Sequence, residues 1–136
     1  MPQLTKNIFE ELSENIKGDV YTDTVRRYLH STDGSYFRVE PACVVYPSDT
    51  EDVVIAVKFA SRYGLSIHSR GAGSGLCGSA IGNGIILDFA KYMNGLVELD
   101  VEGKTFTCLP GFRLGELDVA IKGNGLFFPP DPSSGE

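Results

Sequence analysis

Apolar residues near the start of the chain recur at the spacing of short helices. They fall every four positions from Leu4 to Ile16, and a glycine follows soon after, which predicts a helix over residues 4–16. A second short helix is expected over residues 22–29. Residues 31–35 read Ser-Thr-Asp-Gly-Ser, a composition typical of turns.

The next apolar segments predict a β-α-β unit. A continuous apolar run over residues 42–46 is typical of a buried strand, and residues 49–63 carry apolar side chains on one helical face. A capping box that starts at Ser48 marks the beginning of this helix, and Gly64 ends it in the manner of a Schellman motif. A second strand is expected over residues 65–69. We expect the two strands to be parallel and to lie in one sheet.

The remaining pattern predicts three further elements. Residues 84–89 form another buried strand, and residues 96–101 and 104–109 alternate as the two arms of a hairpin. A helix follows, with apolar residues between positions 114 and 121 on its inner face. Residues 127–132 contain three prolines and exclude both a helix and a central strand.

Residues 70–80 read Arg-Gly-Ala-Gly-Ser-Gly-Leu-Cys-Gly-Ser-Ala and lie between two of the predicted strands. We call this segment the glycine loop. Glycine is used where the backbone needs a positive φ or where another group comes close to it. A loop with exposed, convergent N–H groups suits a phosphate or pyrophosphate. The alternative is a flexible connector, but buried strands on both sides favour a loop that is held in place.

Two known nucleotide-binding motifs are excluded for the glycine loop. Gly73, Gly75 and Gly78 satisfy G-x-G-x-x-G, but the dinucleotide fingerprint requires a helix to begin there, and residues 79–84 are poor helix formers. We therefore reject a Rossmann interpretation. The loop of nucleoside triphosphatases is excluded as well, because the chain has no Gly-Lys-Ser/Thr sequence.

Single residues near the loop carry weaker signals. Arg70 is a candidate for neutralising a phosphate, with a surface cation as the alternative. His68 is expected to be a packed residue rather than a base or a covalent flavin attachment. Asp131 lies between prolines, where a ligand contact and turn chemistry explain it equally well. His30 receives no role.

Composition and charge exclude several classes of protein. The chain has 136 residues, enough for one domain with a core, and its formal net charge of −6 argues against a nucleic-acid surface. No apolar run is long enough to span a membrane, and the N-terminus lacks the regions of a signal peptide, so we expect a cytoplasmic protein. Cys43, Cys77 and Cys108 form no Cys-x-x-Cys pair, so no metal site is expected. Cys43 and Cys108 are predicted to be buried.

An ordered series of short motifs resembles one known family. The matching segments are 31–35 (Ser-Thr-Asp-Gly-Ser), 46–53 (Tyr-Pro-Ser-Asp-Thr-Glu-Asp-Val), 70–78, 85–89, Met93-Asn94, Pro110-Gly111 and 129–132 (Pro-Pro-Asp-Pro), so the match covers roughly residues 30–136. Together they resemble the FAD-linked oxidase family, whose flavin domain is of the p-cresol methylhydroxylase or vanillyl-alcohol oxidase type. The branch most similar contains the glycolate oxidase flavin subunit, D-lactate dehydrogenase and their fusions to an iron–sulfur oxidoreductase.

The resemblance implies a role for each matched stretch. The glycine loop would hold the FAD pyrophosphate through its backbone N–H groups, and two proline-containing segments would line the flavin. The implied cofactor-binding residues are Pro47, Arg70, Gly71, Ala72, Gly73, Ser74, Gly75, Gly78, Ser79, Pro110, Gly111, Pro129, Pro130, Asp131 and Pro132.

Two departures from the family limit what it implies. Some branches attach FAD through a histidine inside the loop, at the position of Gly73 here, so we expect non-covalent FAD. The family also continues beyond the equivalent of Glu136 with more of the flavin domain and a substrate domain. Its catalytic residues lie there, so the catalytic residues are unknown, and we expect this segment alone to be inactive.

We therefore predict an α+β fold, in which the first subdomain of an FAD-binding domain has a small parallel β-α-β sheet followed by antiparallel strands. Residues 1–39 would be a helical accessory segment, and residues 40–136 the N-terminal part of the domain. The implied enzyme oxidises a small 2-hydroxy acid and passes electrons to an acceptor other than oxygen, such as an iron–sulfur domain or subunit. The alternative is a non-enzymatic phosphate- or nucleotide-binding domain that uses the same loop.

Overall fold

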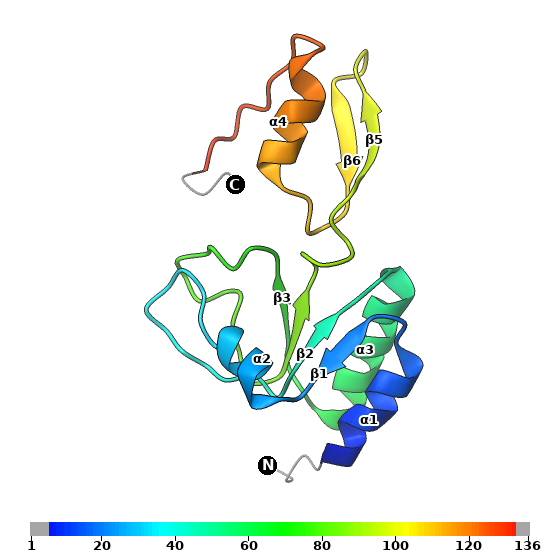
Figure 1. The fold of residues 1–136 in the computed structure, drawn as a ribbon, viewed down its shortest axis with the longest axis vertical. Helices are drawn as coiled ribbons and strands as arrows, with labels where there is room; N and C mark the ends of the chain where they lie inside the picture. Colours follow the sequence, from blue (N-terminus) through cyan, green and yellow to red (C-terminus); the bar gives the residue numbers. More distant parts are fainter. Residues whose placement is uncertain (1–5, 133–136) are drawn as a thin grey trace.

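A computed structural model describes residues 6–132 of the chain, and these residues form two lobes (Figure 1). The first lobe contains a four-stranded sheet and the helices α1 (Lys6–Asn15), α2 (Thr24–Leu29) and α3 (Thr50–Tyr63). The second contains a hairpin and one helix. Residues 4 and 5 of the first predicted helix lie outside the described residues.

The sheet of the first lobe has the strand order β1-β2-β4-β3. Its strands are β1 (Asp19–Tyr21), β2 (Cys43–Tyr46), β3 (Ile67–Arg70) and β4 (Ile85–Asp88). β2 and β3 are each parallel to β4, which confirms that the two strands of the predicted β-α-β unit are parallel and share a sheet. β4 lies between them, and β1 adds an antiparallel edge strand that the sequence did not predict.

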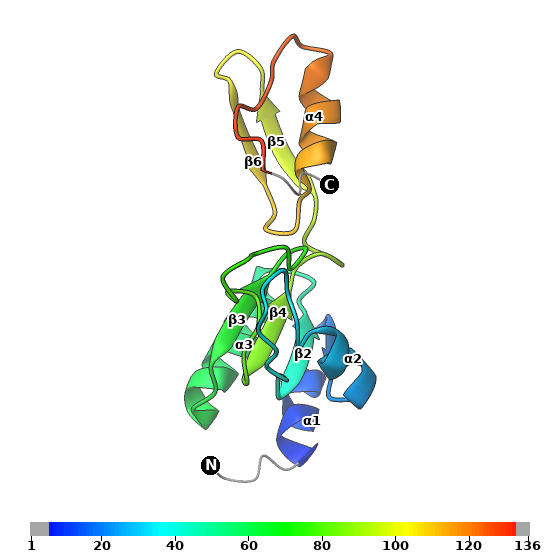
Figure 2. The ribbon, with the colours of Figure 1, turned by 90° about the vertical axis from the view of Figure 1, so that its left-hand side faces the viewer.

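Helices α1 and α3 pack side by side against one face of this sheet (Figures 1 and 2). The rings of Phe9 on α1 and Phe59 on α3 lie 6.0 Å apart between centroids. Both belong to the same buried cluster as Val45 of β2 and Leu87 of β4. The amphipathic pattern of α1 and α3 thus places the main core between the helices and the sheet.

The predicted ends of α3 are only partly confirmed. The N-cap is Asp49, whose carboxylate accepts a hydrogen bond from the N–H of Asp52 at 3.1 Å, so the assignment of the cap to Ser48 was wrong by one residue. Aspartate is as good an N-cap as serine, and the sequence offers both. At the other end Gly64 has φ +67°, and the N–H of Leu65 donates to the carbonyl of Ala60 at 2.9 Å. This confirms the Schellman motif.

Asp52 joins the beginning of the chain to α3. Its fully buried carboxylate accepts hydrogen bonds from the N–H groups of Lys17 and Gly18, each at 2.9 Å, and from the N–H of Ser48 at 2.8 Å. Burial acts to raise the pKa of Asp52, but these hydrogen bonds outweigh it and lower the pKa below its ordinary value. The link between α1 and β1 is therefore fastened to the first turn of α3.

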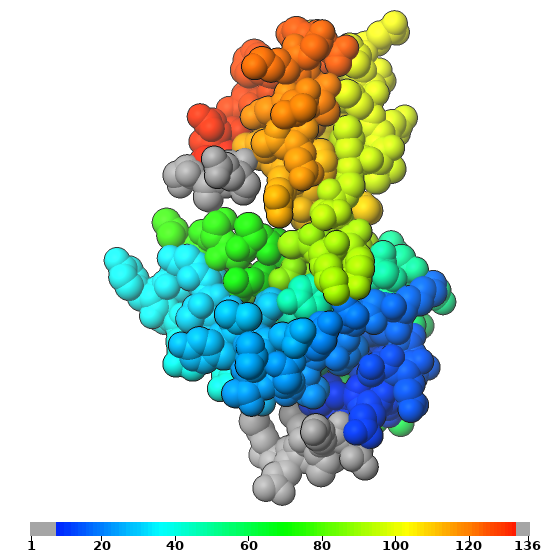
Figure 3. All heavy atoms as spheres, viewed as in Figure 1, coloured from blue at the N-terminus to red at the C-terminus, as the bar shows by residue number. Residues whose placement is uncertain are grey.

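The second lobe consists of β5 (Leu96–Asp100), β6 (Thr105–Cys108) and α4 (Leu114–Lys122). The hairpin and the helix are confirmed at their predicted places. Two backbone hydrogen bonds join the segments that enter and leave the hairpin, from Gly111 to Met93 at 2.8 Å and from Leu109 to Gly95 at 2.9 Å. These segments form the waist between the lobes (Figure 3).

The cysteines differ in their surroundings. Cys43 is buried, as predicted, and burial raises its pKa to about 12. Cys108 is exposed, so the prediction that it is buried was wrong. It ends an edge strand of a two-stranded sheet, where an apolar run in the sequence does not guarantee a second layer to cover it.

Candidate functional site

The glycine loop leaves the carboxyl end of β3 and returns to the start of β4. β2, β3 and β4 are parallel, so their carboxyl ends share one edge of the sheet, where ligands of open α/β sheets usually bind. In Figures 1 and 2 the loop, coloured green, lies on the side of the first lobe that faces the second lobe.

Part of the glycine loop has backbone N–H groups without an acceptor among residues 6–132. Among the described residues, none accepts a hydrogen bond from the N–H groups of residues 71–74. Gly73 and Gly78 have φ values of +69° and +75°, a conformation that side chains disfavour. A Cβ on Gly71 would meet nothing within 4 Å, so space remains beside the backbone there. Unpaired N–H groups in such a loop suit an anion.

The side chain of Arg70 is held against the glycine loop. Its Nη1 donates a hydrogen bond to the carbonyl of Thr32 at 2.7 Å, and its guanidinium occupies the place where a Cβ on Gly73 would lie. The positive charge therefore lies beside the backbone of Gly73. This position adds to the attraction for an anion, although one donor of the guanidinium is already used.

The other predicted residues lie in two places. Pro47 is buried immediately after β2, at the same edge of the sheet as the loop. Pro110 and Gly111 lie at the waist, where a Cβ on Gly111 would collide with the carbonyl of Phe89. The segment from Pro129 to Pro132 is exposed and descends from the second lobe on the side of the glycine loop (Figure 1).

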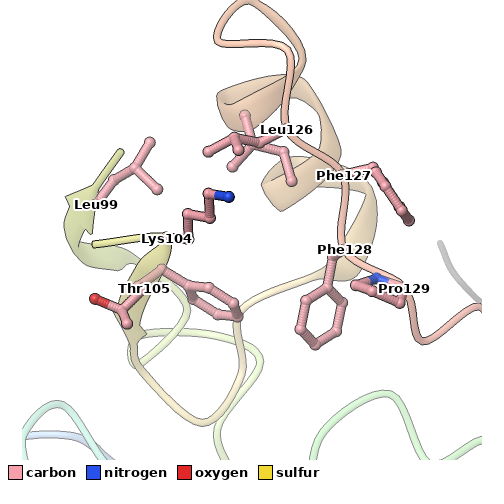
Figure 4. Close-up of a pocket in the computed structure, with 9 residues that line it drawn as sticks. Leu99, Lys104, Thr105, Leu126, Phe127, Phe128 and Pro129 are labelled. Carbon is pink, nitrogen blue, oxygen red and sulfur yellow. The ribbon is translucent and has the colours of Figure 1, made fainter. Parts of the chain in front are cut away.

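A separate cavity of about 500 Å³ lies within the second lobe (Figure 4). Its wall is mostly apolar, with Lys104 as the charged side chain, and the rings of Phe106 and Phe128 meet edge to face at 5.5 Å between centroids. Apart from the aromatic pair before Pro129, nothing in the sequence indicates this cavity. It holds none of the free N–H groups of the glycine loop.

The two histidines have structural contacts. The Nε2 of His68 lies 3.0 Å from the hydroxyl of Ser66, and its ring fills the space beside Gly82, which agrees with the expectation of a packed residue. His30 is buried, and its Nε2 lies 2.9 Å from a carboxylate oxygen of Asp88. Sequence reasoning gave His30 no role, because its partner is far away along the chain.

Residues 6–132 contain neither a metal-binding cluster nor a membrane-spanning helix. No group of three or more His, Cys, Asp or Glu side chains in this range is placed to hold a metal ion. None of the helices described there combines the length and apolar character needed to cross a membrane.

The fold places the glycine loop, whose N–H groups at residues 71–74 have no acceptor among the described residues, at the carboxyl edge of a parallel sheet, as is typical of a cofactor-binding module. The chain belongs to the FAD-binding domain family, whose model matches residues 41–136. Its fold is that of the FAD-linked oxidases, as the sequence resemblance predicted.

Two of three curated relatives match nearly the whole chain. D-2-hydroxyglutarate dehydrogenase of Escherichia coli (strain K12) is 34% identical over 97% of this chain, and glycolate oxidase subunit GlcD of Bacillus subtilis (strain 168) is 32% identical over 96%. D-lactate dehydrogenase of Archaeoglobus fulgidus is 37% identical over 67%. The chain spans only 13%, 28% and 20% of the lengths of these three relatives.

Solved structures share the fold. Alkyldihydroxyacetonephosphate synthase superposes with a TM-score of 0.81 at 23% identity, over 99% of this chain and 28% of that one. The 6-hydroxy-D-nicotine oxidase of Arthrobacter nicotinovorans gives a TM-score of 0.68 at 27% identity, over 81% of this chain and 24% of that one.

FAD is the cofactor of this family, and the residues present fit it. A pyrophosphate is an anion with several acceptor oxygens, and no residue that the structure describes accepts a hydrogen bond from the N–H groups of residues 71–74. Arg70 supplies a compensating charge close by.

Proposed function

We propose that the chain is the FAD-binding portion of a flavin-dependent oxidoreductase that oxidises a small 2-hydroxy acid. The names of the curated relatives support this substrate class, since they act on 2-hydroxyglutarate, glycolate or D-lactate. Residues 40–136 would be the N-terminal part of the FAD-binding domain, with residues 1–39 as an accessory segment. The observation that carries the proposal is that, within residues 6–132, the N–H groups of residues 71–74 have no hydrogen-bond acceptor.

When bound, FAD supplies the two-electron chemistry by which an alcohol carbon is oxidised. The residues of this chain would bind and orient it. The N–H groups of the glycine loop, with Gly78 and Ser79 nearby, would receive the pyrophosphate. Pro110-Gly111 and the segment from Pro129 to Pro132 would line the flavin and exclude water from it, and Pro47 would end β2 next to the ligand.

Three further parts of the proposal concern the complete enzyme. FAD would be held without a covalent bond, because Gly73 stands where some branches have a histidine. Electrons would pass to an acceptor other than oxygen, for which an iron–sulfur domain or subunit is the candidate. The cytoplasm is the proposed location.

The substitution Gly73→Asp in the complete flavoenzyme tests the site. It adds a side chain where the Arg70 guanidinium lies and a negative charge where the pyrophosphate would bind, so the purified protein should contain no FAD. Gly123→Asp is the matched control, because Gly123 has φ −65° and open space beside it at the end of α4. It should keep its flavin.

Flavin content is read from the absorbance spectrum, and circular dichroism checks that both variants are folded. A folded Gly73→Asp variant with full flavin occupancy would show that the loop does not hold the phosphates. Binding of ADP or phosphate without any affinity for FAD would favour the non-enzymatic alternative.

A further inference from the structure

Residues 30–38 lie against the glycine loop. The N–H of Gly34 donates to the carbonyl of Gly73 at 2.9 Å, and the carbonyl of Thr32 accepts the hydrogen bond from Arg70. The N–H of Ala80 lies 3.3 Å from the Oδ2 of Asp33. This one segment therefore contacts the glycine loop at its beginning, its middle and its end. We call residues 30–38 the clamp.

The clamp and the loop also fit together sterically. A Cβ on Gly34 would lie 2.6 Å from the carbonyl oxygen of Ser74, so only glycine permits this approach. A Cβ on Gly78 would lie 3.1 Å from the ring of Phe37. Gly34 of the clamp and Gly78 of the glycine loop are therefore needed for the close contact between these two segments.

The clamp is itself fastened at its base and across its turn. The N–H of Val39 donates to the carbonyl of Ser31 at 2.9 Å, and His30 is held to Asp88 at the end of β4. Within the turn the Oδ1 of Asp33 accepts the N–H of Ser35 at 2.9 Å. The two oxygens of this carboxylate thereby join the turn of the clamp to the far end of the glycine loop.

A carboxylate near an anion site needs an explanation, because it repels the ligand. Asp33 offers no donor when ionised, and hydrogen bonding by Ser35 keeps its pKa below the ordinary value. The Asp33 carboxylate accepts hydrogen bonds from the backbone N–H groups of Ser35 and Ala80. The Arg70 guanidinium is bonded to the same clamp through the carbonyl of Thr32. These contacts indicate that Asp33 stabilises the conformation of the glycine loop and does not itself bind the anion.

We propose that Asp33 is a positioning residue for the FAD site. Its carboxylate holds the glycine loop in the conformation that leaves the N–H groups of residues 71–74 free for the pyrophosphate. This inference rests on the proposed function for its ligand. A loop that is ordered before binding loses less entropy when the ligand arrives, so the clamp contributes to affinity without touching FAD.

The first experiment measures loop order in the 136-residue chain by 15N relaxation and amide exchange. In Asp33→Ala the order parameters of residues 71–79 should fall from about 0.85 to below about 0.6, and the Ala80 amide should lose its protection. Order parameters in β2 and β4 should not change. Asp100→Ala is the matched control, since Asp100 also accepts a turn N–H, from Gly103 at 2.9 Å, but in the hairpin.

The second experiment measures the dissociation constant of FAD in the complete flavoenzyme. Asp33→Ala should weaken binding at least tenfold while the midpoint of urea unfolding stays unchanged. Asp33→Asn keeps one acceptor oxygen and should recover part of the affinity, which a general loss of stability would not produce. If Asp33→Ala unfolds, the FAD dissociation constant of Asp33→Asn is compared with that of the unmodified enzyme, and it should be higher.

The inference is overturned if the variants keep the loop order of the unmodified chain, or if the loop loosens and FAD affinity is unchanged. Its failure is distinguishable from that of the proposed function. An enzyme that binds no FAD refutes the proposed function, whereas the order parameters still decide whether Asp33 holds the loop.

Discussion

His30 and Asp88 are 58 positions apart in the chain, yet the Nε2 of one lies 2.9 Å from the Oδ2 of the other. Both side chains are about nine-tenths buried. The Nδ1 of the same ring lies 2.9 Å from the carbonyl of Arg26, so each ring nitrogen faces an acceptor. The pair fastens the end of α2, and with it the clamp, to the strand that forms the centre of the parallel sheet.

Removing the ring should therefore be costly. His30→Ala leaves a buried carboxylate oxygen without its partner, and we expect the free energy of unfolding to fall by about 2 kcal/mol. Urea denaturation followed by circular dichroism measures this. His68→Ala is the control, because that histidine bonds only an exposed serine hydroxyl, and it should cost less than half as much. Equal losses would contradict a special role for the buried pair.

Asp52 should make stability depend on pH. Its folded-state pKa lies below the unfolded value, so its contribution is complete above about pH 4 and disappears as the pH falls through the folded-state pKa. We expect Asp52→Asn to cost about 2 kcal/mol at pH 7 and progressively less below pH 4. Urea unfolding at several pH values checks this. A difference from the unmodified chain that stays constant down to pH 2 would refute the argument.

FAD in the complete enzyme should be released by denaturation. Gly73 offers no attachment atom, and His68 is packed against Gly82. After unfolding in guanidinium chloride and ultrafiltration, the yellow colour should pass through the filter. Colour retained with the protein would indicate a covalent bond, and digestion followed by mass spectrometry would show whether it lies at the exposed Cys77.

The 136-residue chain by itself should fold but bind FAD weakly or not at all, and should show no dehydrogenase activity. Affinity is the surplus of contacts over the cost of immobilising the ligand, and one part of the flavin site supplies only some of the contacts. Titration with FAD, and an assay of D-lactate or glycolate with an artificial electron acceptor, test this. Stoichiometric binding or turnover would show that this segment contains more of the site than we propose.

Much of the fold was predictable because its signals are local. The helix α3 has caps at both ends and an apolar face, and the hairpin has its turn residues in place. The β1 strand, Asp19–Tyr21, was not predictable, because three residues carry no usable alternation and its pairing with β2 is a tertiary effect. Likewise nothing in the sequence shows that β4 lies between β2 and β3.

In the candidate site, too, the features with local sequence signals were predictable and the tertiary contacts were not. Glycine spacing and the buried segments on both sides indicated the loop, and the structure adds that no residue it describes accepts a hydrogen bond from the amides of residues 71–74. The sequence resemblance includes residues 31–35, but the contacts of the clamp were not predictable, because those of Asp33 and His30 join positions about fifty residues apart or more. Their residue types are ordinary for turns, and only the folded chain shows what they touch.

The waist has a consequence for how this segment can vary among related proteins. The chain enters the hairpin at Gly95 and leaves it at Leu109, and a hydrogen bond of 2.9 Å joins these two residues. An insertion or deletion between them therefore begins and ends at the same point in space. The β5–β6 hairpin is thus a place where evolution can change length while the sheet, the glycine loop and the clamp keep their arrangement.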